Sequence, residues 1–235
     1  MKKAKVLLAG SLILNILFIG IGGYLIHKQG GIAFIKEQVA NATSSQKYPD
    51  YYVQNKDIFE SIRVAKADKI FVGDSITDHG EFQEYYLDQT VLNRGISEDT
   101  SDGVLNRIGE VAERSPKEVY LMIGINDIGA GVDAKTYQKN VEKIIESFDK
   151  NSTKVVLQSI LPINNRDFNN DLSNKKIHEF NAILQQMAQK YGVDYIDLHT
   201  AFEDSDGQLK KDITIDGIHL KGEGYRIWMG KLNNR

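Results

Sequence analysis

Residues 69–75 read KIFVGDS, a short apolar run that ends in a glycine, an aspartate and a serine. Similar apolar runs follow along the chain at 90–93, 118–123, 153–160 and 193–198. Most of these runs are rich in valine and isoleucine and lack a strict alternation of apolar and polar residues. That pattern is typical of strands covered on both faces. We therefore expect five parallel strands, the first of them at 69–72.

Segments with helical spacing of apolar residues lie between these runs. The apolar stripes fall within 104–112, 137–148 and 177–191, and an earlier helix is expected at 55–67. Asp133 is a suitable N-cap for the second stripe, and Gly192 is a suitable C-terminal stop for the third. Strands that alternate with helices predict a three-layer α/β/α sandwich with right-handed crossovers.

The composition limits the classes of function. The chain has 235 residues, of which 41% are hydrophobic and 26% are charged, enough for one globular domain and some extra length. A net charge of -3 gives no reason to expect a nucleic-acid partner. The absence of cysteine excludes disulfides, thiolate nucleophiles and cysteine-bound metals. The histidines show no metal-ligand spacing, so we expect no metal and no cofactor.

The N-terminal residues differ from the rest of the chain. Three lysines lie within residues 1–5, and residues 6–26 carry no charge. A bilayer core needs about 20 such residues, so we expect an uncleaved signal anchor at 1–28 that leaves the bulk of the chain outside the membrane. A cleaved signal peptide is the main alternative, and a buried core helix is another. A linker at 29–47 and one domain at 48–235 would follow.

Polar motifs follow the predicted strands at the edge where open parallel sheets bind ligands. Ser75 follows the first strand, Gly95 the second and Asn126 the third, while Asp216 and His219 come after the fifth. A serine on a sharp strand-to-helix turn exposes its hydroxyl. A histidine preceded by an aspartate three residues earlier supplies a base with its own orienting carboxylate. Together these residues predict a serine hydrolase.

Four blocks of the sequence resemble the GDSL/SGNH hydrolase superfamily. They are GDS at 73–75, Gly95, GIND at 124–127 and DGIH at 216–219. The sequence motifs GDSITD and NRGIS are most similar to those of bacterial esterases of the platelet-activating-factor acetylhydrolase-like branch. The resemblance covers roughly residues 50–235 and implies a flavodoxin-like sandwich with a five-stranded parallel sheet.

The resemblance also implies the role of each site residue. Ser75 would be the nucleophile, His219 the general base, and Asp216 the group that fixes the imidazole tautomer. The backbone amides of Ser75 and Gly95 and the side-chain amide of Asn126 would form the oxyanion hole.

Other polar residues near these blocks have simpler interpretations. Glu98 departs from the family pattern, which often has a small residue after Ile-Ser, and this departure bears on the acyl pocket. Asp74 and Asp127 are expected to brace their turns by hydrogen bonds. Asp197 and His199 form a rival acid–base pair after the last strand, although the family pattern has no equivalent histidine there.

The sequence therefore predicts a membrane-anchored, extracytoplasmic esterase that works through an acyl-enzyme. The loop 164–171 is strongly polar, which favours a short acyl group such as acetate on a glycan over a long lipid chain. The expected partners are an ester substrate, either an O-acylated glycan or a lipid, and the membrane through residues 6–26. The enzymatic alternatives are a lysophospholipase or thioesterase and a glycan O-acetyltransferase. A surface binding protein without turnover and a phosphate or nucleotide binder are the alternatives of other classes.

Overall fold

The computed structural model describes residues 14–15, 18, 20–28, 30–33, 36, 47–62 and 66–233. The chain forms two compact units, 1–47 and 48–235. The predicted anchor at 1–28 and linker at 29–47 fall largely outside the described residues. Within the described part, none of the helices combines the length and the apolar character needed to cross a bilayer.

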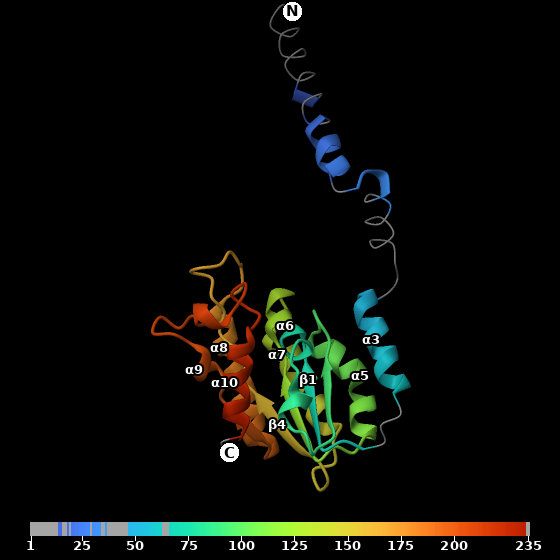
Figure 1. Ribbon diagram of the computed structural model, residues 1–235, viewed down its shortest axis with the longest axis vertical. Helices are drawn as coiled ribbons and strands as arrows, with labels where there is room; N and C mark the ends of the chain where they lie inside the picture. The colour runs from blue at the N-terminus through green and yellow to red at the C-terminus, as the bar shows by residue number, and fades with distance from the viewer. Residues whose placement is uncertain are drawn as a thin grey trace, which may run out of the picture. The chain divides into compact units, whose positions relative to one another are not determined.

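The second unit is built on a five-stranded sheet (Figure 1). The strands are β1 Lys69–Gly73, β2 Val91–Gly95, β3 Glu118–Met122, β4 Lys154–Gln158 and β5 Asp194–Ile196. They pair in the order β2-β1-β3-β4-β5, and every pair is parallel. The predicted five-stranded parallel sheet is confirmed, and its order is that of flavodoxin-like folds. Because Gly73 is in register with both Gly95 and Met122, three strands end level at one edge.

Helices follow each of the strands. The helical elements are α3 Asp50–Ser61, α4 Ser75–Asp78, η1 Phe82–Tyr85, α5 Ser101–Glu113, α6 Ile125–Gly129, α7 Ala134–Glu146, α8 Asn174–Tyr191, α9 His199–Phe202, η2 Lys211–Ile213 and α10 Gly222–Asn233. The prediction of a helix at 55–67 was wrong in its bounds. The helix begins at Asp50, directly after Pro49, because a proline suits a helix start and an acidic residue in the first turn complements the helix dipole.

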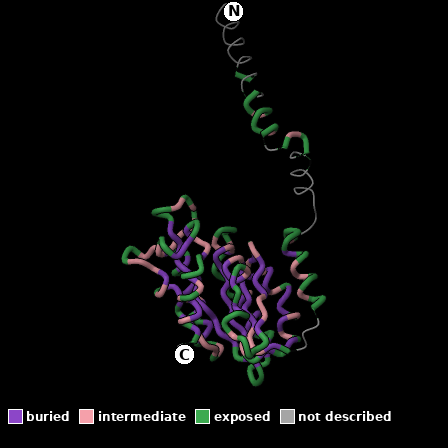
Figure 2. Tube along the Cα trace, viewed as in Figure 1, coloured by how far each residue is buried: buried purple, intermediate pink, exposed green. Residues whose placement is uncertain are grey.

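The strands bury both of their faces, which explains their continuous apolar character. On one face, Ile70 and Leu121 pack with side chains of α5, α7 and α8. On the other face, Phe71 stacks on Phe82 with ring centroids 3.9 Å apart, and Trp228 of α10 packs in the same cluster. Figure 2 shows this buried interior between exposed outer surfaces. The three predicted layers therefore cover both faces of the sheet.

Candidate active site

Ser75, His219 and Asp216 form a hydrogen-bonded chain. Ser75 is the first residue of α4, directly after β1 and the N-cap Asp74. Its Oγ lies 2.9 Å from His219 Nε2, and His219 Nδ1 lies 2.6 Å from Asp216 Oδ2. The structure thus brings together three residues that the sequence analysis selected, although Ser75 and His219 are 144 positions apart.

A tight loop before α10 presents the histidine. Thr214 Oγ1 donates to the carbonyl of His219 at 2.7 Å and accepts the N–H of Gly217 at 3.0 Å. Gly217 has a φ of 88°, and a Cβ at this position would lie 2.5 Å from the carbonyl oxygen of Asn164. Only glycine fits this left-handed, crowded position, so the DGIH sequence is explained by the turn that it makes.

The electrostatics of the pair suit a general base. Burial acts to raise the pKa of Asp216, but hydrogen bonds from the side chain and backbone of His219 outweigh it, and the pKa is lowered. An ionised carboxylate only accepts hydrogen bonds, so His219 carries its proton on Nδ1 and directs the Nε2 lone pair at Ser75. The side chains are 27% exposed for His219 and 46% exposed for Asp216, so solvent and substrate reach the site.

Asn126 lies in the first turn of α6, at the end of β3. Its side chain is half-buried, and Nδ2 donates to the main-chain carbonyl of Asp99 at 2.9 Å. Gly124 precedes it with a φ of 137°, which allows the sharp turn from strand to helix. An amide nitrogen carries two hydrogens, so the bond to Asp99 fixes the amide and leaves a second donor for a ligand.

Gly95 has a different place from the one predicted for it. Its N–H donates to Asn93 Oδ1 at 2.8 Å and is therefore occupied. A Cβ on Gly95 would lie 2.1 Å from the backbone nitrogen of Asp78. Gly95 is thus needed where β2 passes close to α4, and the structure gives it a packing role in place of the predicted role as oxyanion donor.

Glu98 occupies the loop between β2 and α5 in a left-handed conformation, with a φ of 66°. Its backbone N–H has no hydrogen-bond partner among the residues that the structure describes. The loop is held on both sides, because Ile96 N–H donates to the carbonyl of Gly73 at 3.1 Å and Ser97 Oγ donates to Asp78 Oδ2 at 2.7 Å. From the sequence, Glu98 was identified only as a departure from the family pattern. Its free backbone amide was not predicted.

Asp74 and Asp127 accept hydrogen bonds in the protein interior. Asp74 Oδ1 accepts the N–H of Ile76 at 3.0 Å, and Asp127 accepts both the N–H and the hydroxyl of Ser101 at 2.9 and 2.5 Å. Burial raises the pKa of Asp74 to about 7 and also raises the pKa of Asp127. Asp74 braces its own turn, as the sequence analysis expected, whereas Asp127 bonds to the first residue of α5 and not to the turn that contains it.

Because its pKa is raised, Asp74 should make the free energy of unfolding depend on pH. A carboxyl whose pKa is about 7 in the folded state and 3.8 when unfolded contributes fully to stability below pH 3.8. That contribution is lost as the pH rises toward 7, because only the unfolded state then gains from ionisation. Asp74→Asn keeps the oxygen that caps α4, so its unfolding free energy relative to wild type should rise on the order of 4 kcal/mol from pH 4 to pH 7.

Urea unfolding of both proteins across this pH range measures the difference. Asp133→Asn is the control with the opposite sign, because hydrogen bonds from Thr136 lower the pKa of Asp133 in the folded state. Its stability relative to wild type should fall as the pH rises. A pH-independent difference for Asp74→Asn would show that folding does not raise the pKa of Asp74.

The rival pair Asp197 and His199 is not arranged as an acid–base pair. His199 is buried, and its Nδ1 lies 3.0 Å from the carbonyl oxygen of Ile160. Asp197 instead accepts the N–H and the hydroxyl of Thr200 in α9. In the described part of the chain, no three histidine or acidic side chains are grouped to hold a metal ion. Close to the site, His79 is exposed, with its ring 5.5 Å from that of His219.

Comparisons with known proteins agree with this site. The GDSL-like Lipase/Acylhydrolase family matches residues 71–227. Platelet-activating factor acetylhydrolase IB subunit alpha2 of Rattus norvegicus is 26% identical over 166 residues, which cover 67% of this chain and 71% of the relative. A solved structure from Streptococcus pneumoniae, described as a platelet activating factor, is 29% identical with a TM-score of 0.72, over 85% of this chain and 97% of that chain.

A likeness of fold alone extends to an acetyl xylan esterase, AlAXEase. It is 24% identical with a TM-score of 0.62, over 71% of this chain and 98% of that chain. The family match covers most of the sheet and the blocks that carry Ser75, Asn126 and His219. The chain therefore belongs to the GDSL-like lipase/acylhydrolase family and is a serine hydrolase.

Proposed function

We propose that this enzyme hydrolyses carboxylic esters through an acyl-enzyme on Ser75, and the hydrogen-bonded chain from Ser75 to Asp216 carries the proposal. Ser75 Oγ attacks the ester carbonyl carbon and gives its proton to His219 Nε2. The tetrahedral intermediate then expels the alcohol, which leaves with that proton. Water attacks the acyl-serine in the same way, and the carboxylic acid and free Ser75 are released.

Three donors surround the position of the oxyanion in this proposal. The N–H of Ser75, at the first position of α4, has no intrahelical partner. The N–H of Glu98 replaces that of Gly95, which Asn93 occupies. The second hydrogen of Asn126 Nδ2 is the third donor. These groups belong to three adjacent turns at one edge of the sheet, where donors held in advance stabilise developing charge.

Asn126→Ala should lower kcat by about 10²–10³-fold with little change in KM, because an oxyanion donor acts mainly in the transition state. Steady-state hydrolysis of 4-nitrophenyl acetate measures both constants. Asn151→Ala, in an exposed turn before β4, is the matched control and should keep kcat within twofold. A decrease in kcat of less than threefold for Asn126→Ala would show that Asn126 is not an oxyanion donor.

A polar loop beside His219 favours a short acyl group. The loop 164–171 contacts the catalytic turn, because the N–H of Asn164 donates to the carbonyl of Gly217 at 2.8 Å. Arg166 on this loop bonds to Asp204 at 2.9 Å and Asp206 at 2.6 Å, so polar groups face solvent next to the site. We therefore propose acetyl esters on a glycan as substrates. The acetylhydrolase relative and the acetyl xylan esterase of similar fold support this choice.

Ester hydrolysis resolved by acyl length tests the proposal. The full chain and its Ser75→Ala variant are assayed with 4-nitrophenyl esters from C2 to C16 and with O-acetylated oligosaccharides. The highest kcat/KM is expected for acetyl esters, with no turnover by the variant. A preference for C8–C16 chains indicates a lysophospholipase or thioesterase, and acetyl transfer to an added sugar in preference to water indicates an O-acetyltransferase. No Ser75-dependent turnover would overturn the proposal and favour a binding protein.

The location of the enzyme is a separate part of the proposal. Residues 6–26 carry no charge and follow three lysines, which supports a single anchor with the catalytic unit outside the membrane. The test is the fractionation of cells that express the full chain, together with protease treatment of intact cells. Recovery in the membrane fraction and cleavage by external protease are expected. Recovery in the soluble cell fraction would contradict the anchor.

A further inference from the structure

Arg107 is a charged residue on the buried side of α5. Its side chain is only 3% exposed, and that of its ion-pair partner Asp99 is 1% exposed. Arg107 Nε donates to Asp99 Oδ2 at 2.8 Å, and Nη2 donates to the carbonyl of Gly73 at 3.1 Å. A buried ion pair is costly to desolvate and adds little net stability compared with apolar residues. Because stability alone does not account for the Arg107–Asp99 pair, we ask which groups the pair orients.

Asp99 connects this ion pair to the oxyanion donors. Its carboxylate accepts from Arg107 and from the N–H of Thr100 at 2.9 Å. Its main-chain carbonyl accepts Asn126 Nδ2 at 2.9 Å, and its N–H donates to the carbonyl of Ile96 at 3.1 Å. Asp99 is also the next residue after Glu98. The buried Asp99 thus anchors the loop that carries the N–H of Glu98, and its main-chain carbonyl orients the side-chain amide of Asn126.

Arg107 is also connected to the turn that carries Ser75, through the carbonyl of Gly73. Gly73, whose carbonyl accepts Arg107 Nη2, is the last residue of β1 and precedes Ser75 by two positions. The same carbonyl accepts the N–H of Ile96 from the Glu98 loop. One guanidinium therefore fixes the strand end that positions Ser75 and the loop that positions Asn126.

We propose that Arg107 is a positioning residue for ester hydrolysis, which acts through Asp99 on the Asn126 donor and through Gly73 on the Ser75 turn. The proposal rests on the ester hydrolase function proposed above. Arg107 does not need to touch the substrate, since its two contacts set the geometry of the groups that do. Misplacement of such groups by about 1 Å lowers turnover by up to about 10²-fold.

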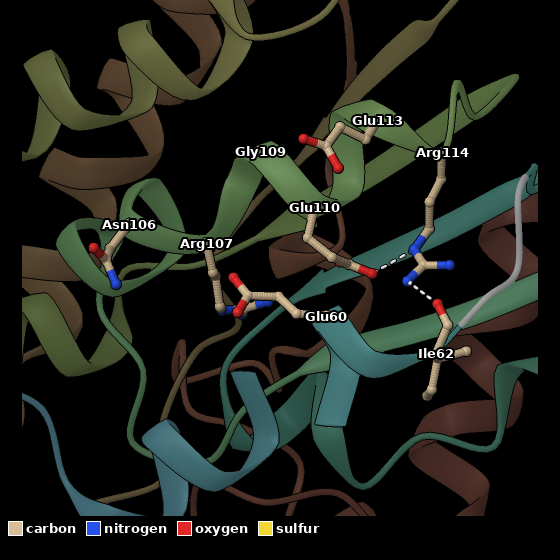
Figure 3. Close-up of a pocket in the computed structure, with 8 residues that line it drawn as sticks. All are labelled: Glu60, Ile62, Asn106, Arg107, Gly109, Glu110, Glu113 and Arg114. Atoms are coloured by element: carbon tan, nitrogen blue, oxygen red, sulfur yellow. Dashed lines mark hydrogen bonds and ion pairs between the residues drawn. The ribbon is translucent and has the colours of Figure 1, made fainter. Parts of the chain in front are cut away.

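The chain offers a matched control at the C-terminal end of the same helix. Arg107 and Arg114 both line a cavity of about 480 Å³ together with Glu60 and Glu110 (Figure 3). Arg114 is also buried, but its Nη2 donates to the carbonyls of Phe59 at 2.8 Å and Ile62 at 2.9 Å, at the end of α3. Loss of either arginine removes a buried guanidinium from the α5 region, whereas only Arg107 contacts the loop and strand end of the site.

The experiment is a double-mutant cycle on the full chain with 4-nitrophenyl acetate. Arg107→Gln should lower kcat about 10–100-fold with KM within threefold. Arg114→Gln should lower the melting temperature comparably and keep kcat within threefold. In the Asn126→Ala background, Arg107→Gln should lower kcat by a smaller factor than in wild type, because one of the two groups that Arg107 positions is already absent.

Two results would overturn the inference. One is a full additional loss of kcat in the Asn126→Ala background, and the other is an equal loss of kcat in Arg114→Gln. If Arg107→Gln does not fold, Asp99→Asn breaks the same ion pair while it keeps the carbonyl, and the same cycle applies. Ser75-dependent turnover by wild type is measured first. Its absence contradicts the ester hydrolase function itself, whereas additive variants contradict only the role of Arg107.

Discussion

Ser75→Ala and His219→Ala should each lower kcat for ester hydrolysis by about 10⁴–10⁶-fold. Ser75 Oγ lies 2.9 Å from His219 Nε2, so the histidine takes the proton as the oxygen attacks, and neither group works without the other. Because the two act as one unit, the double variant should be no slower than the slower single variant. Single-turnover hydrolysis of 4-nitrophenyl acetate at high enzyme concentration measures such slow rates.

A histidine away from this chain of hydrogen bonds provides the control. His178→Ala changes an exposed residue of α8 beside His199 and should keep kcat within twofold. Circular dichroism of all variants should match wild type, because His219 is partly exposed and Ser75 becomes only slightly smaller. Additive losses in the double variant would be inconsistent with a Ser75–His219 unit and would require separate roles for the two residues.

Gly95→Ala should lower the free energy of unfolding by about 3 kcal/mol or more. Its Cβ would lie 2.1 Å from the nitrogen and 2.5 Å from the Cα of Asp78, and 2.6 Å from the carbonyl carbon of Thr77. These are backbone atoms of α4, so relief requires a shift of the helix that begins with Ser75. Urea unfolding monitored by circular dichroism measures the loss.

Gly109→Ala is the matched control for Gly95→Ala. Gly109 lies in α5, and a Cβ there would meet no atom within 4 Å. Alanine should therefore stabilise the helix by up to about 1 kcal/mol. Both substitutions keep the backbone N–H, so a folded Gly95→Ala protein with wild-type stability would refute the packing role that the structure gives to Gly95.

Much of the fold follows from the sequence because its signals are local. Apolar runs covered on both faces, such as 118–123, predicted buried strands, and the alternation with helical stripes predicted their parallel arrangement. The bounds were less accurate. The strand expected at 193–198 is β5 Asp194–Ile196, since Asp197 lies beyond the sheet and accepts the N–H of Thr200 in α9. The first helix was displaced because its apolar pattern is weak and its start depends on Pro49.

The residues of the hydrogen-bonded Ser75–His219–Asp216 triad were predictable from the sequence, whereas the proposed oxyanion donors depend on tertiary detail. Ser75, Asp216 and His219 occur in recognisable blocks, and the structure brings them into contact. The occupation of the Gly95 amide by Asn93 Oδ1 depends on a side-chain conformation that no pattern records. The free amide of Glu98 likewise depends on a left-handed backbone that the flanking bonds impose.

Arg107 had a signal in the sequence that the analysis did not use. It lies three residues after Val104 and four before Val111, on the apolar stripe of α5. A charged residue on a buried helix face requires a partner, because an unpaired buried charge is strongly unfavourable. The pattern therefore indicated a buried ion pair, but the identity of Asp99 as its partner requires the loop geometry.

The 144-position separation of Ser75 and His219 has a consequence for how activity arises during folding. The proposed nucleophile follows a central strand, whereas the proposed base precedes α10, which carries the only tryptophan of the chain, Trp228, buried in the core. A chain in which α10 is undocked would lack the hydrogen bond between Ser75 and His219. Indole fluorescence and ester turnover should therefore both report the docking of this helix, one optically and one chemically.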